Sequence, residues 1–520
     1  MRRIALTIAI ALCALTIMAQ SDKADMAQVR KLVLTHSAIV NLYVDEGDEE
    51  KMVEASIKAM LKELDPHSTY LTAKEVEKMN EPLQGNFEGI GVQFNIADDT
   101  LFVIQTVSKG PSEKVGILPG DRIVTVNDTT IAGVKMERDE IVKRLRGPKG
   151  TVVCLGIVRR GYDELLSFNV TRDKIPVNTL DAAYMIAPKV GYIKISSFGA
   201  TTHEEFSEAL KKLKQEKMKH LILDLQGNGG GYLKAAVDMA NDFLQGGQQI
   251  VYTEGNKSPY SAFNAEGKGQ FQEGRLVVLI DEYSASASEI VTGAVQDWDR
   301  GIVVGRRSFG KGLVQRPISL PDGAMIRLTV ARYHTPSGRC IQKPYGEDID
   351  YRKELQERFN KGEMMHADSI HFPDSLKFQT KILGRTVYGG GGIMPDHFVP
   401  LDTLSYTKYH RELTAKGVIV NTNLTIIDRY RNELKEKYPT FEEYNKKFKV
   451  DDELLARLHQ YAERDSVKPK DKEEFEKSLP QISLQMKALL ARDLWDMNEY
   501  FAIRYEDDDI VNKAIQLMEE

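Results

Sequence analysis

Cysteine is scarce in this sequence, whose 520 residues include only three. Cys13 lies in an apolar N-terminal segment, while Cys154 and Cys340 are far apart and lack the close spacing of zinc ligands. A disulfide-rich scaffold and a structural zinc site are therefore excluded. A single bridge between Cys154 and Cys340 stays open, but two unrelated thiols are the simpler interpretation, and neither stands in a catalytic pattern.

An excess of positive charge is also missing. The net charge is −6 and the isoelectric point is near 6.0, so the chain lacks the basic field that attracts nucleic acid. We interpret the lysine-rich run at 211–219 as a solvated helix face. A hydrophobic content of 42% and a charged content of 28% are typical of a soluble globular protein, and the length predicts two to four domains.

Long apolar runs are confined to the N-terminus, which reads MRRIALTIAIALCALTIMA before it turns polar. This pattern is typical of a secretory signal peptide, with cleavage predicted after Ala19. The alternative is a retained membrane anchor, because Ile17 is larger than the residue that the cleavage site prefers. Since no later segment is long and apolar enough to span a bilayer, membrane contact is expected only through this segment. The sequence therefore predicts an exported protein of the cell envelope, periplasmic in a diderm bacterium.

Four kinds of sequence pattern follow one another along the rest of the chain. Apolar residues recur at helical spacing up to residue 80, short β-rich segments with glycine turns follow, and strands then alternate with helices from 190 to 335. Beyond 345 the chain is charged and helical in pattern. The predicted divisions are a signal peptide (1–19), an N-terminal helical region (20–84), a β-rich module (85–175), an α/β core (176–400) and a helical C-terminal region (401–520).

The β-rich module contains a glycine pair before a strand, GIGV at 89–92. Alone it would indicate a tight β-turn, but the downstream run VSKGPSEKVGILPGDRIVTVND (107–128) resembles the middle of a PDZ domain. PDZ domains add the free C-terminus of a partner to a sheet edge as an extra strand and hold its carboxylate with loop amides. The resemblance implies that the residues around this loop bind a peptide C-terminus: Gly89, Ile90, Gly91 and Val92.

The familiar signatures of hydrolases are missing. The sequence contains no G-x-S-x-G elbow, no H-E-x-x-H helix and no GNSGG serine loop. An S-x-x-K pattern at Ser405 and Lys408 lies in the charged C-terminal region without companion motifs, so we attribute it to chance. His67, in the LDPHS segment, is interpreted as part of a structural turn between helices.

Three serines alternate with alanine in DEYSASASEIVTGAVQD (281–297), directly after the apolar strand pattern LVVLI. The spacing of Ser286 and Glu289 fits a helix capping box, and the alternative is a catalytic serine. Lys311 stands between two glycines in SFGKGLVQ. For a lysine to accept a serine proton, its pKa must fall by roughly 3 units, on the order of 4 kcal/mol, which requires burial. The glycine-rich DLQGNGGGYL (224–233) offers free N–H groups for an oxyanion hole.

The order of the motifs along the chain resembles that of the C-terminal processing peptidases, or tail-specific proteases. The motifs are the PDZ-like run, DLQGNGGGYL, SASASEIVTGAVQD and GRRSFGKGLVQ. Three more segments resemble parts of the same family: LDPHSTYL, GRCIQKPYG and GGGGIMPD. The resemblance implies an α/β, crotonase-like core (a ββα spiral) with an inserted PDZ domain and helical ends. It also implies a reaction without a metal or organic cofactor. One position departs from the family pattern: Gln226 stands where an arginine is usual.

The resemblance assigns roles residue by residue. It implies Ser286 as the nucleophile, Lys311 as the general base, Gln315 as a residue that orients the lysine from one helix-like spacing away, and Asp297 as a supporting residue at the end of the serine helix. The oxyanion hole would combine the amide of Ala287 with that of Gly229 or Gly230, and Arg146 would dock the PDZ domain onto the core.

Helix geometry agrees with the choice of serine. At 100° per residue, Ser284 and Ser288 share a helix face and Ser286 points to the other side, so only one of the two groups can line a cleft. Ser284 and Ser288 are then expected to cap and pack. Ser286 at the helix start would also lie beside the positive end of the helix dipole.

The sequence thus predicts an exported serine endopeptidase that acts on proteins or peptides with a free apolar C-terminus. A homo-oligomer is expected, an adaptor protein is a further candidate partner, and nucleic acid is not expected. Two rival functions stay open. A non-catalytic PDZ scaffold would have no need of the serine, the lysine and the glutamine together. A hydrolase of small acyl substrates would not require a free peptide carboxylate.

Overall fold

The structure is a computed structural model that describes residues 23–346 and 349–519. The predicted signal peptide, with its cleavage site after Ala19, lies outside the described residues. Between 23 and 84 the chain forms three helices, as the apolar spacing predicts. They are α2 (Lys23–Leu42), α3 (Glu49–Lys62) and α4 (Ala73–Gln84).

A six-stranded sheet forms the centre of the α/β core, in the order β10-β11-β12-β15-β16-β21. Only β10 is antiparallel to its neighbour; the other pairs are parallel. Parallel strands covered on both faces are apolar throughout, and every residue of β15 is buried. The strands are β10 (Leu180–Ala187), β11 (Val190–Ile195), β12 (His220–Asp224), β15 (Leu276–Ile280), β16 (Ile302–Gly305) and β21 (His397–Phe398).

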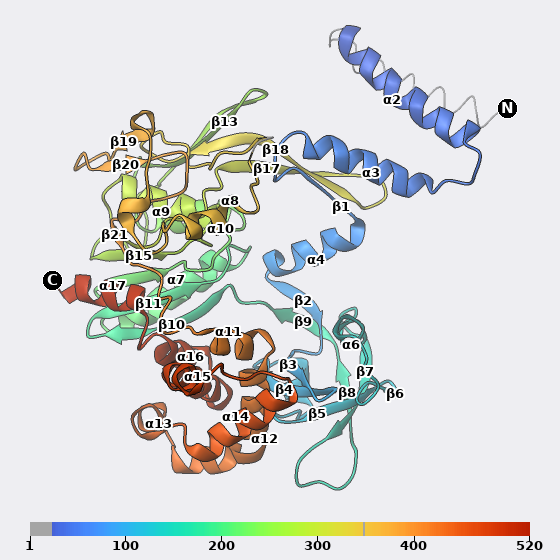
Figure 1. The fold of residues 1–520 in the computed structure, drawn as a ribbon, viewed down its shortest axis with the longest axis vertical. Coiled ribbons are helices and arrows are strands. Elements are labelled where there is room, and N and C mark those ends of the chain that lie inside the picture. The colour runs from blue at the N-terminus through green and yellow to red at the C-terminus, as the bar shows by residue number, and fades with distance from the viewer. Residues whose placement is uncertain (1–22, 347–348, 520) are drawn as a thin grey trace.

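Helices cover both faces of this sheet (Figure 1). On one face pack α7 (Thr202–Gln215), α8 (Leu233–Asn241) and α9 (Ala287–Asp297), with Phe206, Ala236 and Val291 among the buried contacts. On the other face pack α16 (Met497–Arg504) and α17 (Asp509–Glu519), through residues such as Val511 and Ala514. The end of the chain therefore completes the core of the α/β unit.

A second, antiparallel sheet lies beside the first and receives a strand from the N-terminal region. Its order is β1-β18-β13-β14, with β17 also paired to β18. Because β1 pairs with β18, with Tyr70 opposite Ile326, the LDPHS segment just before β1 is brought against the core. The strands are β1 (Thr69–Leu71), β13 (Gln249–Gly255), β14 (Ser258–Asn264), β17 (Leu313–Ser319) and β18 (Met325–His334). Nearby lie α10 (Glu354–Asn360), β19 (Lys377–Gln379) and β20 (Thr386–Tyr388).

The β-rich module has a hydrophobic core of its own. It enters and leaves through β2 (Asn86–Gly89) and β9 (Asp173–Pro176), which pair with each other and join the module to the rest of the chain (Figure 1). Its elements are β3 (Val92–Ala97), β4 (Thr100–Thr106), α5 (Pro111–Lys114), β5 (Arg122–Val126), β6 (Thr129–Thr130), α6 (Arg138–Leu145), β7 (Val152–Val158) and β8 (Leu166–Thr171).

The helical C-terminal region also has its own core and holds the β-rich module. Arg122 pairs with Asp428 at 2.7 Å, and Gln105 Nε2 donates to the carbonyl of Arg492 at 3.0 Å. Leu424 packs against Ala97 of the module. The helices are α11 (Lys408–Ala415), α12 (Val418–Lys437), α13 (Phe441–Lys447), α14 (Asp452–Arg464) and α15 (Lys472–Leu494).

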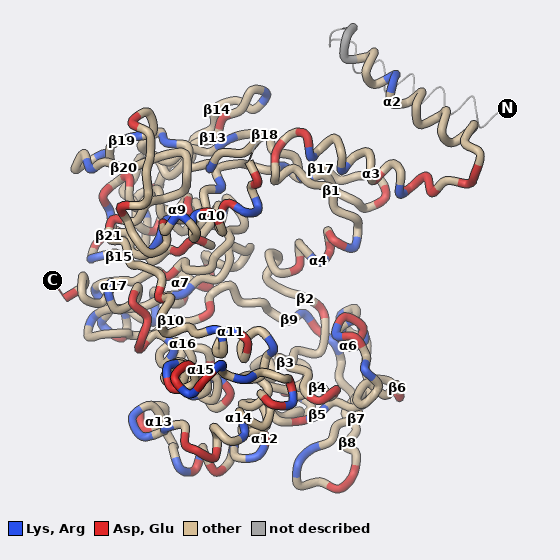
Figure 2. The backbone as a smooth tube through the Cα atoms, in the orientation of Figure 1, with Lys and Arg blue, Asp and Glu red and all other residues tan. Residues whose placement is uncertain are grey.

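The first described helix, α2, extends away from the body of the molecule (Figure 1) and carries few charged residues (Figure 2). Many of its apolar side chains are exposed, among them Val29, Leu32, Val33 and Val40. Within the described ranges, no helix is both long and apolar enough to cross a membrane.

The observed architecture is mixed α/β with a β-rich insertion and helical ends, as expected from the sequence. The domain boundaries and the crotonase-like character of the core stay predictions. Cys154 lies in β7 of the module and Cys340 in the α/β core, and both are free thiols.

Candidate active site

The three alternating serines occupy different environments. Ser284 and Ser288 are fully buried, and their hydroxyls donate to the carbonyls of Leu225 at 2.8 Å and Asn228 at 2.9 Å. Both serines therefore support the glycine-rich loop after β12. Ser286 is partly exposed, so it is the one serine of the three that can face a substrate.

Ser286 has a strained backbone, with φ 55° and ψ −110°. A positive φ is disfavoured for a residue with a Cβ and persists only where surrounding contacts hold it. Here the Ser286 N–H donates to Glu289 Oε2 at 2.8 Å, and its carbonyl accepts from Ile290 N–H at 3.0 Å. Because α9 begins only at Ala287, the helical geometry predicted for Ser284 and Ser286 is wrong. The strained turn, and not a helix face, separates the two kinds of serine.

Lys311 lies in the loop between β16 and β17 and is bound to the serine turn through two shared side chains. Glu289 accepts the Lys311 N–H at 2.9 Å with the same oxygen that accepts the Ser286 N–H. The Tyr333 hydroxyl is within hydrogen-bonding distance of the carbonyl oxygens of Ser286 and Lys311. The structure thus brings these two predicted residues together, although no hydrogen bond joins Ser286 Oγ and Lys311 Nζ among the described residues.

Glu289 is a site residue that the sequence indicated only as a capping partner. Its buried carboxylate also accepts from Ser308 Oγ at 2.5 Å and from Gly310 N–H at 2.7 Å. Burial raises the pKa of Glu289 to about 7, while these hydrogen bonds act in the opposite direction. Since the donors come from two segments, this carboxylate fastens the lysine loop to the start of the serine helix.

The Lys311 amine lies in an environment that favours its neutral form. Burial, together with the positive charge of Arg327, lowers the pKa of Lys311 to about 8. The carboxylates of Glu289 and Asp65 act against this shift. In the described part of the chain, no carboxylate forms an ion pair with the amine, so near pH 8 a large fraction of it can accept a proton.

Gln315 lies on strand β17, so the helix-like spacing from Lys311 that the sequence suggested is wrong. Its Nε2 donates to Thr329 Oγ1 at 3.2 Å, and Thr329 Oγ1 donates to Asp65 Oδ1 at 3.1 Å. Between residues 23 and 346, no hydrogen bond connects Gln315 to Lys311. The glutamine instead belongs to a polar chain that ends in the LDPHS turn.

The LDPHS turn was predicted to be structural, and it also contributes to the surroundings of the lysine. Asp65 accepts the N–H groups of His67 at 2.8 Å and Ser68 at 2.9 Å, which forms the turn. Burial lowers the pKa of His67 to about 4, and the charge of Lys311 adds to this effect. His67 is therefore neutral at physiological pH, with Nε2 2.8 Å from the Tyr351 hydroxyl. The pairing of β1 with β18, which single-sequence patterns do not reveal, places the turn here.

The glycine-rich loop packs directly on Ser286. A Cβ added to Gly230 would lie 2.8 Å from Ser286 Cβ and 2.8 Å from the Ala285 carbonyl oxygen. The Gly230 N–H donates to Asn228 Oδ1 at 2.8 Å, so it is already engaged. Among the described hydrogen bonds, the N–H groups of Gly229 and Ala287 have no partner. Of the two predicted glycine donors, Gly229 is therefore the free one.

Asp297 and Gln226 lie in supporting networks. Asp297 is fully buried and pairs with Arg339 at 2.7 Å, which ties the end of α9 to the 335–339 segment. The Gln226 N–H donates to Asp224 Oδ1 at 2.8 Å, and its carbonyl accepts from Lys194 Nζ at 2.9 Å. The Gln226 side chain also donates from Nε2 to Asp224 Oδ2 at 3.4 Å, so the start of this loop is held by the buried Lys194–Asp224 pair through both the backbone and the side chain of the glutamine.

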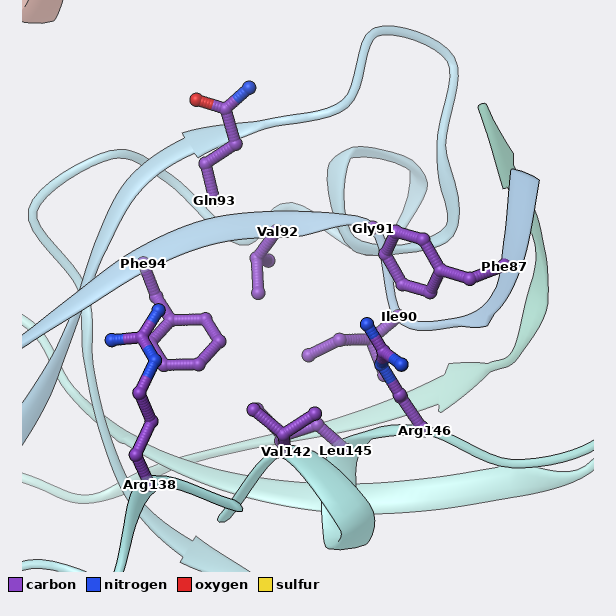
Figure 3. Close-up of a pocket in the computed structure, with 10 residues that line it drawn as sticks. All are labelled: Phe87, Ile90, Gly91, Val92, Gln93, Phe94, Arg138, Val142, Leu145 and Arg146. Carbon is purple, nitrogen blue, oxygen red and sulfur yellow. The ribbon is translucent and has the colours of Figure 1, made fainter. Parts of the chain in front are cut away.

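A second site lies between β3 and α6 of the β-rich module, as a groove of about 330 Å³ (Figure 3). Ile90, Gly91 and Val92 line one end of the groove, next to Gly89, the last residue of β2. The described residues provide no hydrogen-bond acceptor for the N–H groups of Ile90 and Gly91, so a peptide carboxylate can bind there. Arg146 lies at this end and pairs with Glu81 of α4 at 2.5 Å. Among the described residues, no hydrogen bond or ion pair joins the Arg146 side chain to the peptidase core.

Comparison with protein families matches four segments of the chain. Residues 189–351 match peptidase family S41, and residues 78–158 match the PDZ domain. Residues 12–75 match the N-terminal domain of the activating protease CtpB, and residues 409–496 match DUF8443, a family of unknown function.

Two individual relatives agree with these matches. The chain is 35% identical to the carboxy-terminal processing protease CtpB of Bacillus subtilis over 62% of its own length and 68% of the relative. It is 37% identical to the carboxy-terminal-processing protease of Bartonella bacilliformis over 58% of its own length and 69% of the relative. The photosystem II D1 C-terminal processing protease aligns with 70% of this chain and 86% of its own. The two chains are 24% identical, and their TM-score is 0.35.

These matches define a serine-type peptidase with a PDZ domain. Within that class, the chain belongs to the carboxy-terminal processing proteases.

The close approach of Gly230 to Ser286 predicts a position-specific effect of alanine. Gly230→Ala should lower kcat/KM by about 10²-fold or more, because the new methyl group displaces the Ser286 turn. Gly229→Ala is the matched control, since no atom lies within 4 Å of its added Cβ and its N–H is retained. Peptide cleavage assays, with thermal melting to check folding, measure both effects. Equal activity of the two variants would contradict the proposed packing.

The surroundings of Lys311 predict a pH dependence. Only the neutral amine accepts a proton, so kcat/KM should rise with pH through an apparent pKa of about 8 and level off above it. Arg327→Met removes a neighbouring positive charge and should raise the apparent pKa of this rise in kcat/KM, whereas Arg327→Lys should leave the apparent pKa unchanged. If the apparent pKa of kcat/KM is the same in Arg327→Met as in the unmodified chain, the titrating group is not Lys311, and Glu289 is the next candidate.

Proposed function

We propose that this chain is an exported endopeptidase that cleaves proteins with a free apolar C-terminus, using Ser286 as nucleophile and Lys311 as general base. The observation that carries the proposal is the carboxylate of Glu289, which binds the N–H groups of both residues. It holds the backbone of a partly exposed serine beside the backbone of a lysine that is itself partly buried and whose pKa is lowered. A serine–lysine pair needs both conditions, since the amine must be neutral and close to the hydroxyl.

In the proposed reaction, the Lys311 amine accepts the proton of Ser286 Oγ while this oxygen attacks the scissile carbonyl carbon. The carbonyl oxygen becomes negatively charged and receives hydrogen bonds from the N–H groups of Ala287 and Gly229. The positive end of the α9 dipole stabilises the same charge. The lysine ammonium then donates its proton to the leaving amine. Water, deprotonated by Lys311, hydrolyses the acyl-serine ester and restores the enzyme.

The remaining predicted residues act through their neighbours in this proposal. Gln315 is proposed to act on the lysine indirectly, through Thr329 and Asp65, whose charge reaches Lys311. Asp297 supports α9 through its buried pair with Arg339. The parallel sheet with α8 and α9 on one face supports a crotonase-like core at 176–400, with the PDZ domain at 85–175 inserted ahead of it.

Substrates are proposed to bind through the PDZ groove. The free N–H groups of Ile90 and Gly91 suit a terminal carboxylate, and the apolar lining beside them suits an apolar last residue. The N-terminal sequence pattern supports export to the cell envelope, so envelope proteins are the expected substrates and an adaptor protein is a further candidate partner.

The first test compares the mature chain with Ser286→Ala on an unstructured peptide that ends in a free apolar residue. Cleavage should fall by about 10⁴-fold or more in Ser286→Ala and in Lys311→Arg, because a guanidinium does not release its proton. An amidated peptide should be cleaved more slowly, and mass spectrometry of the products identifies the cut. Cleavage that persists in Ser286→Ala would place the nucleophile elsewhere. Equal cleavage of the amidated and the free peptide would favour the rival function, a hydrolase that does not require a free peptide carboxylate.

The exposed apolar residues of α2 support the proposed homo-oligomer. Val29, Leu32, Val33 and Val40 recur at helical spacing on a helix that extends away from the molecule, and such a stripe is stabilised by a partner helix. Replacing Leu32 and Val40 together by glutamine should reduce the oligomer to monomers in sedimentation velocity. Replacing Arg30 and Lys31 by glutamine is the control on the same helix. An unchanged mass in the Leu32/Val40 variant would exclude α2 as the contact.

A further inference from the structure

The groove of the PDZ domain differs between its two ends. Figure 3 shows Val92 and Phe94 of β3 pointing into the groove, while Gln93 points away from it. On the opposite side, α6 contributes Arg138 at its first residue and Leu145 at its last. Leu145 lies toward the end that contains Ile90 and Gly91, and Arg138 lies at the other end beside Phe94.

Strand geometry defines which peptide residue reaches each end. A peptide that places its carboxylate at the N–H groups of Ile90 and Gly91 and pairs with β3 must run antiparallel to that strand. Alternate side chains of a strand share a face, so the last residue and the residue two positions before it both point into the groove. Their Cα atoms are about 7 Å apart along the strand. The last side chain therefore lies near Leu145, and the other lies near Phe94 and Arg138.

Of the two arginines that line this groove, Arg138 has no ion-pair partner among residues 23–346 and 349–519. Its guanidinium is stacked over the Phe94 ring at 4.9 Å from the centroid, and across the described ranges no carboxylate lies within ion-pair distance of it. The acidic residues that follow it on α6 are engaged elsewhere, Asp139 with Lys78 at 2.8 Å and Glu140 with Arg144 at 3.1 Å. Arg146 lies at the end of the groove that contains Ile90 and Gly91, and it already forms an ion pair with Glu81.

Among the residues that the structure describes, no acidic side chain lines the groove. We propose that Arg138 selects substrates with aspartate or glutamate two residues before an apolar C-terminal residue. The inference rests on the proposed function, in which the groove binds the substrate C-terminus. A guanidinium held on an aromatic ring loses little side-chain freedom when it pairs with a carboxylate, which favours this contact over an ordinary exposed ion pair.

The test uses the full chain with Ser286→Ala, so that peptides are bound without being cleaved. Fluorescence anisotropy compares peptides that differ only at the third residue from the C-terminus, which is glutamate, glutamine or lysine. The glutamate peptide should bind about three- to fivefold more tightly than the glutamine peptide at low salt, and the lysine peptide more weakly than both. Arg138→Gln should abolish the difference between glutamate and glutamine, and Arg138→Glu should reverse the order of glutamate and lysine.

Two controls localise the effect. Arg144→Gln removes an arginine from the same helix that is paired with Glu140, and it should leave the order of the peptides unchanged. Placing glutamate, glutamine or lysine at the penultimate peptide residue should alter binding little, because that residue points to the side of Gln93 and away from the groove.

The outcomes separate the inference from the proposed function. Equal binding of the glutamate and glutamine peptides, together with weaker binding of an amidated peptide, overturns the role of Arg138 and leaves the groove as the C-terminus site. Binding that does not depend on a free carboxylate overturns the proposed function of the groove and the role of Arg138 with it. A glutamate preference that survives in Arg138→Gln assigns the selection to another residue and also overturns the inference.

Discussion

The geometry of the candidate active site depends on one buried carboxylate. Glu289 is fully enclosed by protein, and a buried carboxylate is stable only when its oxygens receive hydrogen bonds. Its donors come from its own helix start and from the 308–311 loop, so satisfying the carboxylate also fixes Ser286 and Lys311 relative to each other. The same burial raises the pKa of Glu289 and lowers that of Lys311, because an environment poor in water favours the neutral form of both groups.

Segments from both ends of the chain pack against the α/β core. Strand β1 adds to β18 and brings Asp65 and His67 close to Lys311. At the other end, α16 and α17 cover the face of the core sheet that α8 and α9 leave open. The C-terminal helices also hold the PDZ domain through Arg122 and Asp428. The catalytic core and the peptide-binding domain are therefore attached to the same helical region, in addition to the β2/β9 connection.

The sequence predicted much of the site, with instructive errors. The ordered motifs predicted Ser286 and Lys311 as a pair, and the structure joins their backbone N–H groups through Glu289. The capping-box spacing indicated Glu289 without its contacts to the lysine loop. The helical spacing assigned to Gln315 was wrong because an isolated four-residue interval fits a helix turn and an extended strand equally well. The LDPHS turn was recognised as structural, but its position beside Lys311 depends on the pairing of β1 with β18, which spans more than 250 residues of sequence.

What the sequence determined by itself is therefore local or ordered along the chain: the alternation of strands and helices, the glycine turns, the serine turn and the series of family motifs. These follow from backbone preferences and side-chain periodicity, which act over a few residues. Only the tertiary structure decided which amides stay free, which carboxylates are buried and how far the lysine pKa falls. Those properties arise from contacts between distant segments, since burial and hydrogen bonding depend on what packs nearby and not on neighbours in sequence.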